Sequence, residues 1–331
     1  MNDDAASYFQ AHESAAFLRQ ASGYLEISGA DRAAFLQRQT TNDIRLLGPG
    51  RALATVLTSP TAHILDLLWL LEEGEAIVAL TLPDRGPATA RFLRGRIFFM
   101  DRVTVRDTSA EAAVFELVGP RAPEVLGRLG GTRWPAVGEV IAGVCAGATW
   151  RAIGGAGLTG LGCLLLASAE HASTIEDALQ QASAAPLSPE SYEALRIEAG
   201  QPGVAGELVE EYTPLEVGLR DVIADNKGCY TGQEVIARQI TYDKVARSLV
   251  GLRAEEPLTS GAQVLVGSRL AGAVTSAAVS PRLGPIGLAV LRRPLPQPGE
   301  SVTVRALTRA IAATVVELPM IPRPYPSNAY N

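Results

Sequence analysis

Residues 225–234 read Asp-Asn-Lys-Gly-Cys-Tyr-Thr-Gly-Gln-Glu, and this stretch is the most informative in the chain. Thr231 and Glu234 have the spacing of a capping box, which predicts that Thr231 is the N-cap of a helix over residues 232–239. Cys229 then lies just before a helix N-terminus, where free amide groups and the helix dipole favour a thiolate. The motif therefore predicts a reactive cysteine at position 229.

The neighbours of Cys229 suit such a role. Lys227 lies two residues earlier, so in an extended stretch its ammonium falls on the same side of the chain and favours the thiolate as well. Tyr230 offers a ring for stacking and a hydroxyl for hydrogen bonds. A buried, inert cysteine is the alternative, and the residues alone leave both readings open. Cys145 and Cys163 lie in apolar strand contexts and are expected to be inert core residues.

The segment from Lys227 to Glu234 resembles, residue for residue, the signature of YgfZ-type proteins. These are tetrahydrofolate-binding factors connected with iron–sulfur protein maintenance, and they share a fold with the glycine-cleavage T-protein, an aminomethyltransferase. The resemblance covers most of residues 20–250, through weaker matches at Ile27–Asp31, Gln39–Asp43, Leu57–Asp66, Leu195–Gly200 and Pro214–Gly218. It implies a T-protein-like fold that binds tetrahydrofolate or a one-carbon derivative.

The same resemblance implies a set of site residues. Glu198 would pair with the N–H donors at the pterin edge, with Asp66 as a neighbour, because a carboxylate can accept from that edge. The full predicted folate-binding set is Glu198, Asp66, Tyr230, Gln233 and Arg96, the arginine serving the anionic glutamate tail. The predicted catalytic set is Cys229, Lys227 and Tyr230. No resident metal is predicted, because one cysteine cannot supply the protein ligands that a cluster usually needs.

Two departures from the T-protein pattern weigh against ordinary glycine cleavage. T-proteins place two adjacent acids in the strand after a glycine pair, whereas here Asp66 is followed by Leu67, and Ala62-His63 replaces the glycines. T-proteins also lack the cysteine-containing signature. Whether this chain is an enzyme therefore stays open.

Strand and helix signals predict an α+β protein of several parts. The strand–helix order over residues 1–107 indicates a ferredoxin-like unit, and Glu26 and Gly29 recur 90 residues later as Glu116 and Gly119. That echo fits either a duplicated unit or chance identities. The predicted domains are a discontinuous folate-binding unit (1–107 and 186–244), a second α+β unit (108–185), a small antiparallel β-barrel (245–318) and a Pro-rich tail (319–331).

Composition narrows the function classes. The 331 residues carry a net charge of −6, which does not resemble the basic footprint of a nucleic-acid binder. Three cysteines without a CxxC pattern fit a reducing compartment, and the acidic first residues, Met1–Asp4, do not resemble a secretory signal, so a cytoplasmic location is predicted. The uncharged stretch 152–169 is rich in glycine and is predicted to hold a buried strand at Leu161–Ala167, not a membrane span. We expect a monomer with no membrane partner.

Three functions stay open from the sequence. The first is a tetrahydrofolate-binding factor that assists assembly or repair of iron–sulfur client proteins, using Cys229. The second is a folate-dependent one-carbon transferase or demethylase of the aminomethyltransferase class, which the retained Asp66 allows. The third is a non-catalytic folate sensor. An anionic ligand could also use the arginine cluster Arg91, Arg94, Arg96 and Arg102, although a solvated helix face is the commoner explanation.

Overall fold

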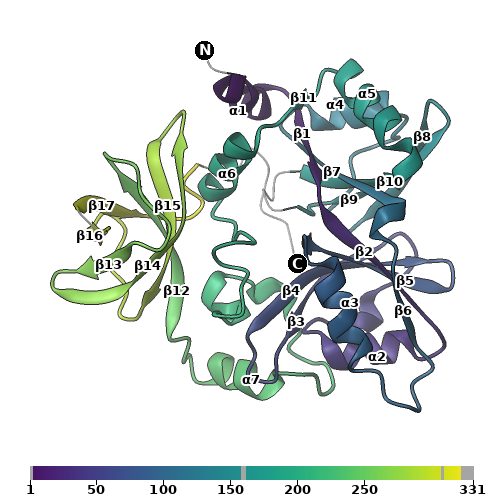
Figure 1. Ribbon diagram of the computed structural model, residues 1–331, viewed down its shortest axis with the longest axis horizontal. Helices are drawn as coiled ribbons and strands as arrows, with labels where there is room; N and C mark the ends of the chain where they lie inside the picture. The colour runs from purple at the N-terminus through teal and green to yellow at the C-terminus, as the bar shows by residue number, and fades with distance from the viewer. Residues whose placement is uncertain (1–2, 158–161, 307–308, 322–331) are drawn as a thin grey trace.

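A five-stranded antiparallel sheet, a six-stranded mixed sheet and a closed barrel make up the molecule, a computed structural model that describes residues 3–157, 162–306 and 309–321 (Figure 1). In spatial order, the five-stranded sheet contains β3 (Ala52–Thr58), β4 (Ile64–Glu73), β5 (Ala76–Pro83), β2 (Ser22–Ser28) and β6 (Thr104–Asp107). The six-stranded sheet contains β11 (Ala185–Pro186), β1 (Ala16–Gln20), β7 (Ala112–Val118), β10 (Gly162–Ser168), β9 (Ala148–Gly154) and β8 (Val140–Cys145).

The barrel is closed and antiparallel, as the strand-rich C-terminal sequence predicts. Its strands, in spatial order, are β12 (Arg247–Ala254), β15 (Gly284–Arg292), β14 (Arg269–Ser280), β13 (Gln263–Val266), β16 (Ser301–Arg305) and β17 (Ala310–Val316). Burial alternates along β17, which is the pattern of a strand with one face in a core and one in solvent. The predicted α+β class with a C-terminal antiparallel barrel is confirmed.

Seven α-helices accompany the sheets in the described part of the chain. They are α1 (Asp3–Glu13), α2 (Arg32–Gln39), α3 (Gly86–Arg94), α4 (Ala122–Arg128), α5 (Ala172–Gln181), α6 (Pro189–Glu198) and α7 (Gln233–Thr241). Ser188 caps α6 by accepting a hydrogen bond from the Ser191 amide, and Pro189 follows it at the first helical position. No helix among the described residues is long and apolar enough to cross a membrane.

The residues that recur at a spacing of 90, Glu26 with Glu116 and Gly29 with Gly119, lie in a repeated local structure. Gly29 follows β2 and Gly119 follows β7, and both have left-handed backbone angles, with φ of +101° and +108°. In both places a helix follows the glycine, and an added Cβ would strike backbone, at 2.1 Å from the Arg102 carbonyl oxygen and 2.5 Å from that of Ser14. The repeat therefore includes the turn between strand and helix as well as the residue identities.

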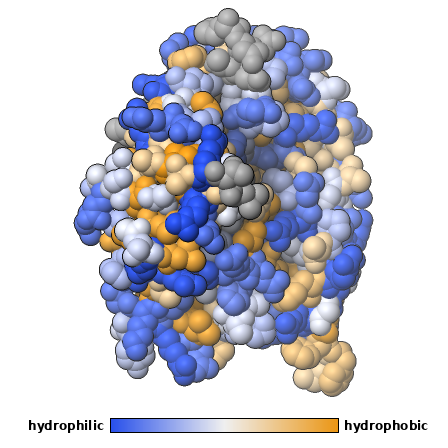
Figure 2. Space-filling model, turned by 60° about the vertical axis from the view of Figure 1, so that its left-hand side comes forward, coloured by the Kyte–Doolittle hydropathy of each residue, from blue (hydrophilic) through white to orange (hydrophobic). Residues whose placement is uncertain are grey.

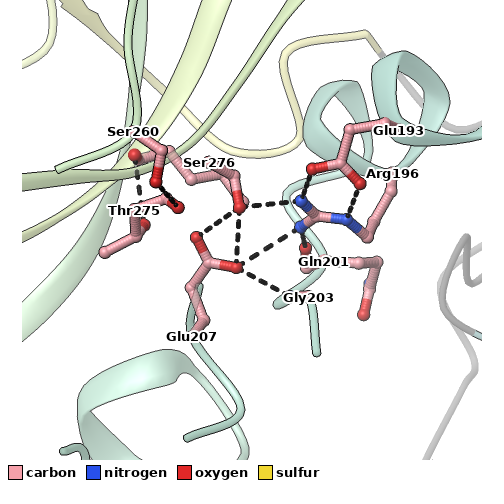
Figure 3. Close-up of polar contacts among 9 residues, drawn as sticks. Glu193, Arg196, Gln201, Gly203, Glu207, Ser260, Thr275 and Ser276 are labelled. Carbon is pink, nitrogen blue, oxygen red and sulfur yellow. Dashed lines mark hydrogen bonds and ion pairs between the residues drawn. The ribbon is translucent and has the colours of Figure 1, made fainter. Parts of the chain in front are cut away.

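A buried ion pair fastens α6 and the following loop to the barrel (Figure 3). Arg196 of α6 is 2% exposed, and Glu207 has no exposed surface. Arg196 Nη1 lies 3.5 Å from Glu207 Oε2, and Arg196 Nη2 donates to Ser276 Oγ of β14 at 2.8 Å. Ser276 in turn donates to Glu207 at 2.8 Å, and the Gly203 amide donates to Glu207 at 2.7 Å. The barrel is thus joined to α6 and the loop after it by buried polar contacts.

Candidate functional site

The signature segment is a loop whose residues separate into inward and outward positions. Lys227 is buried, and its ammonium donates to the carbonyl oxygens of Thr40 and Asn42, both at 2.6 Å. The same ammonium lies 4.9 Å from the centroid of the Tyr230 ring, which is within the range of a cation–π contact. Burial lowers the pKa of Lys227 to about 8 and raises the pKa of Tyr230 to about 12. These two residues hold the loop against the segment that follows α2.

The predicted capping box at Thr231 is wrong. Helix α7 begins at Gln233, and its N-cap is Gly232, which has a φ of +84° and no capping side chain. Thr231 instead contacts α2, because its amide donates to the Arg38 carbonyl oxygen at 3.0 Å. A Cβ at position 232 would lie 2.8 Å from the Ser59 carbonyl oxygen, so only glycine fits there without movement. Contacts with α2 and with the turn between β3 and β4 therefore fix this conformation, and a local capping box does not.

Cys229 lies at the outward position of the loop and is exposed to solvent. Of the other two thiols, Cys163 is fully buried, and burial raises its pKa well above the ordinary value, while Cys145 is half-buried. The expectation that the Lys227 ammonium falls on the same side of the chain as Cys229 is wrong, because Lys227 is buried and donates to two carbonyl oxygens while Cys229 is exposed. An influence of Lys227 on the reactivity of the thiol stays a prediction. The loop presents one accessible thiol at a fixed place.

A second polar centre lies between the two sheets, in a pocket of about 50 Å³. Glu116 of β7 is 1% exposed, and its Oε2 accepts from Gln20 Nε2 at 2.8 Å and from the Tyr192 hydroxyl at 3.0 Å. Burial, followed by the Glu116 charge, raises the pKa of Tyr192 well above its ordinary value, so the phenol stays protonated and donates. Apolar side chains surround this end of the pocket, among them Leu67, Trp69, Leu80, Leu82 and Leu164.

Asp66 precedes the lining residue Leu67 on β4 but does not itself line the pocket, and it has no exposed surface. Its carboxylate accepts from the Leu67 and Leu82 amides at 2.9 and 3.0 Å, and from the Thr89 hydroxyl at 2.5 Å. Burial raises the pKa of Asp66 to about 7 despite these donors. Such a carboxyl can exist in either protonation state near neutral pH.

The predicted carboxylate Glu198 lies at the end of α6, where it contacts helix α1. Its Oε1 accepts from the Tyr8 hydroxyl at 2.6 Å, its Oε2 lies 3.2 Å from His12 Nε2, and its carbonyl oxygen accepts from the Met320 amide. Glu198 does not line the pocket that contains Glu116. Its role as the folate carboxylate stays a prediction.

The other predicted residues are distributed over two elements. Gln233 is half-buried at the start of α7, next to the signature loop, and Arg96 is half-buried after α3, with its guanidinium 5.0 Å from the Phe92 ring centroid. Sequence reasoning missed Gln20, Glu116 and Tyr192 as a site. The available signal was Glu116 itself, which is the single charged residue in the otherwise apolar run Ala112–Val118.

A larger groove of about 1000 Å³ opens elsewhere between the sheets. Its lining is acidic, with Glu26, Glu73, Glu75 and Glu111. Its tyrosine and arginine are already paired: the Tyr24 hydroxyl donates to Glu73 at 2.6 Å, and Arg151 donates to Tyr24 at 2.8 Å. An acidic lining disfavours an anionic ligand, so the smaller apolar pocket around Glu116 is the better candidate for a folate.

Comparisons with known proteins agree with this architecture. The GCVT N-terminal domain model matches residues 11–227, and the glycine cleavage T-protein C-terminal barrel domain model matches residues 247–321. A chloroplastic protein of Arabidopsis thaliana named as a transferase is 31% identical over 318 residues, 93% of this chain and 71% of that protein. An aminomethyltransferase of Moorella thermoacetica is 31% identical over 326 residues, 91% of this chain and 85% of that protein.

A solved structure has the same fold. The glycine cleavage system aminomethyltransferase T from Bartonella henselae superposes with a TM-score of 0.85 at 21% identity, covering 97% of this chain and 90% of that one. The predicted relationship to T-proteins is therefore confirmed at the level of the whole chain. With both of its characteristic domains present in order, the chain belongs to the glycine-cleavage T-protein family.

Proposed function

We propose that this protein is a tetrahydrofolate-binding factor of the YgfZ type that assists assembly or repair of iron–sulfur proteins. The observation that carries the proposal is the separation of two features. One is an apolar pocket with an oriented carboxylate, Glu116, and the other is an exposed thiol, Cys229, at the outward position of the signature loop. A folate would occupy the pocket while the thiol meets a client protein at the surface.

The pocket chemistry suits the edge of a pterin. A pterin presents adjacent N–H donors, and a carboxylate such as Glu116 accepts such donors with charge-assisted hydrogen bonds. Gln20 and Tyr192 hold the carboxylate in place, and Trp69 supplies an aromatic side chain in the lining. A pterin is larger than the present space of about 50 Å³, so its binding requires lining side chains to move. Tetrahydrofolate or a one-carbon derivative is the proposed ligand.

The folate proposal predicts that Glu116→Gln weakens tetrahydrofolate binding. Losing a charge-assisted hydrogen bond costs roughly 1.5–3 kcal/mol, which is about a tenfold to hundredfold loss of affinity. Isothermal titration with tetrahydrofolate measures this, and Glu198→Gln tests the other candidate carboxylate in the same way. Thermal unfolding of both variants checks that each is folded. Unchanged affinity in Glu116→Gln would contradict the assignment, and a loss confined to Glu198→Gln would transfer the role to that residue.

The thiol proposal predicts that Cys229 is alkylated first in the native protein, because it is exposed while Cys163 is buried and Cys145 is half-buried. Peptide mass spectrometry after a short iodoacetamide treatment measures the order, and unfolded protein, in which all three react, is the control. Cys229→Ser should keep folate binding but lose support of iron–sulfur enzyme activity in cells that lack the native protein. Full support by Cys229→Ser would show that the thiol is not used.

A one-carbon transferase or demethylase is the second candidate, and Asp66 is the observation that favours it. A carboxyl with a pKa of about 7 can accept or donate a proton near neutral pH, as a general acid or base must. The aminomethyltransferases among the relatives give this candidate its reaction class. Conversion of an added one-carbon derivative of tetrahydrofolate during the titration would favour it. A cytoplasmic location and a monomeric state stay predictions.

A further inference from the structure

The loop that joins α3 to β6 presents an apolar tip to solvent. The side chains of three consecutive residues are exposed there: Phe98 by 66%, Phe99 by 98% and Met100 by 75%. The loop lies at the lower edge of the molecule in Figure 1, and Figure 2 shows a pale orange projection at that edge. Large apolar side chains gathered in one exposed place mark interaction sites more often than single ones do.

Hydrogen bonds hold the tip in a defined turn. The Asp101 amide donates to the Phe98 carbonyl oxygen at 2.9 Å, and the Phe98 amide donates to Asp101 Oδ2 at 3.0 Å. Arg38 of α2 fixes the same carboxylate with contacts of 2.8 and 3.0 Å. These contacts hold the turn closed, so its apolar side chains face outward instead of folding back onto the core.

The charge around the tip is opposite in sign to that of the whole chain. Residues 91–102 contain four arginines and one aspartate, whereas the chain has a net charge of −6. Arg91 and Arg94 precede the tip on α3 and are exposed. Arg102 follows the tip with 74% of its side chain exposed, and its guanidinium is paired with Asp31 at 3.0 Å, so Arg91 and Arg94 carry most of the positive charge. An anionic surface is the complementary partner, because basic side chains near such a surface are attracted to it.

We propose that this tip, Phe98–Met100, is a peripheral contact that inserts into an anionic lipid surface. A protruding tip this exposed needs a binding partner that can surround it. The interfacial region of a bilayer can do so because it is deformable. The apolar side chains would enter the boundary of the acyl chains, while the flanking arginines contact headgroup phosphates. This departs from the sequence expectation of no membrane partner, and it concerns contact with a surface, not a span.

Co-sedimentation with vesicles tests the proposal. The full chain should sediment with vesicles of phosphatidylcholine mixed with phosphatidylserine, less with phosphatidylcholine alone, and less as salt is raised. Phe99→Ser should lower the partition coefficient at least about tenfold, or about 1.4 kcal/mol. Arg91→Glu should lower it too. The matched control is Val279→Ser, which replaces a side chain 60% exposed on β14 of the barrel and should have no effect.

The possible outcomes distinguish a lipid partner of the tip from a protein partner. Absence of sedimentation with anionic vesicles would overturn the proposal, as would equal losses in Phe99→Ser and Val279→Ser. Light scattering on the same samples measures the oligomeric state. If wild type forms dimers, Phe99→Ser does not, and neither protein binds vesicles, the proposal is overturned and the tip is an interface between copies of this chain. Loss of vesicle binding in Phe99→Ser alone, with wild-type thermal stability, supports insertion.

Discussion

Arg196→Met is expected to lower the free energy of unfolding by about 3–5 kcal/mol. Methionine fills much of the space of the arginine stem but removes the only cation within ion-pair distance of the Glu207 carboxylate in the described part of the chain. Because Glu207 has no exposed surface, its charge would be left in a dry interior, and among the residues that the structure describes only Gly203 and Ser276 would remain as donors. The contacts that join α6 to the barrel should weaken most.

Denaturant unfolding measures the total loss, and hydrogen exchange locates it. We expect faster exchange in α6 and β14 than in the five-stranded sheet. The matched control is Glu193→Ala, which removes the partly exposed partner of the same guanidinium and should cost less than about 1 kcal/mol. The double variant Arg196→Met/Glu207→Leu should regain stability, because it removes the stranded charge as well. Equal stability of wild type and Arg196→Met would contradict a structural role for the pair.

Asp66→Asn is expected to stabilise the protein at pH 8 and to leave its stability nearly unchanged at pH 4. Burial raises the pKa of Asp66 from 3.8 to about 7, so between these values the folded state holds a proton that the unfolded state has lost. The free energy of unfolding therefore falls as pH rises through this window. At about 1.4 kcal/mol for each pH unit, the buried charge costs on the order of 4 kcal/mol at pH 8.

Asparagine keeps the contacts that surround Asp66. Its carbonyl oxygen can accept from the Leu67 and Leu82 amides, and its amide can donate to the Thr89 hydroxyl. Thermal unfolding of wild type and variant at a series of pH values measures the difference. The control is Asp84→Asn, an acid in the turn before α3. If Asp66→Asn instead destabilises the protein at pH 8, the ionised carboxylate is the form that the fold stabilises.

Segments with strong local patterns were predictable, because their conformation depends on neighbours in sequence. The predicted strand Leu161–Ala167 is observed as β10, Gly162–Ser168, with Leu161 outside the described residues, and the predicted C-terminal antiparallel barrel is observed as strands β12 to β17. Strand β1 was not predicted, and it pairs with β7, about a hundred residues away. Such pairing is decided by tertiary contacts that no local pattern contains.

The same limit applied to the site. Cys229 is exposed at the outward position of a short loop in which Lys227 and Tyr230 are buried, and its predicted reactivity stays a prediction. The pocket around Glu116 could not be assembled from sequence, since its polar residues come from three elements brought together only by the fold. Glu198 illustrates the converse, because its motif was recognised but its partners, Tyr8 and His12, were not predicted.

The signature loop contains residues whose buried contacts hold it in place and one residue whose side chain is exposed. Lys227, Tyr230 and Gly232 determine the conformation, and the exposed Cys229 makes no side-chain hydrogen bond within the described part of the chain. Substitutions at position 229 should therefore change the reactivity of the loop with little loss of folding stability. Substitutions of Lys227, Tyr230 or Gly232 should instead disturb the conformation of the loop. A related protein could keep the surrounding residues, lack the thiol and still fold. The motif by itself therefore indicates the conformation of the loop and not the chemistry at position 229.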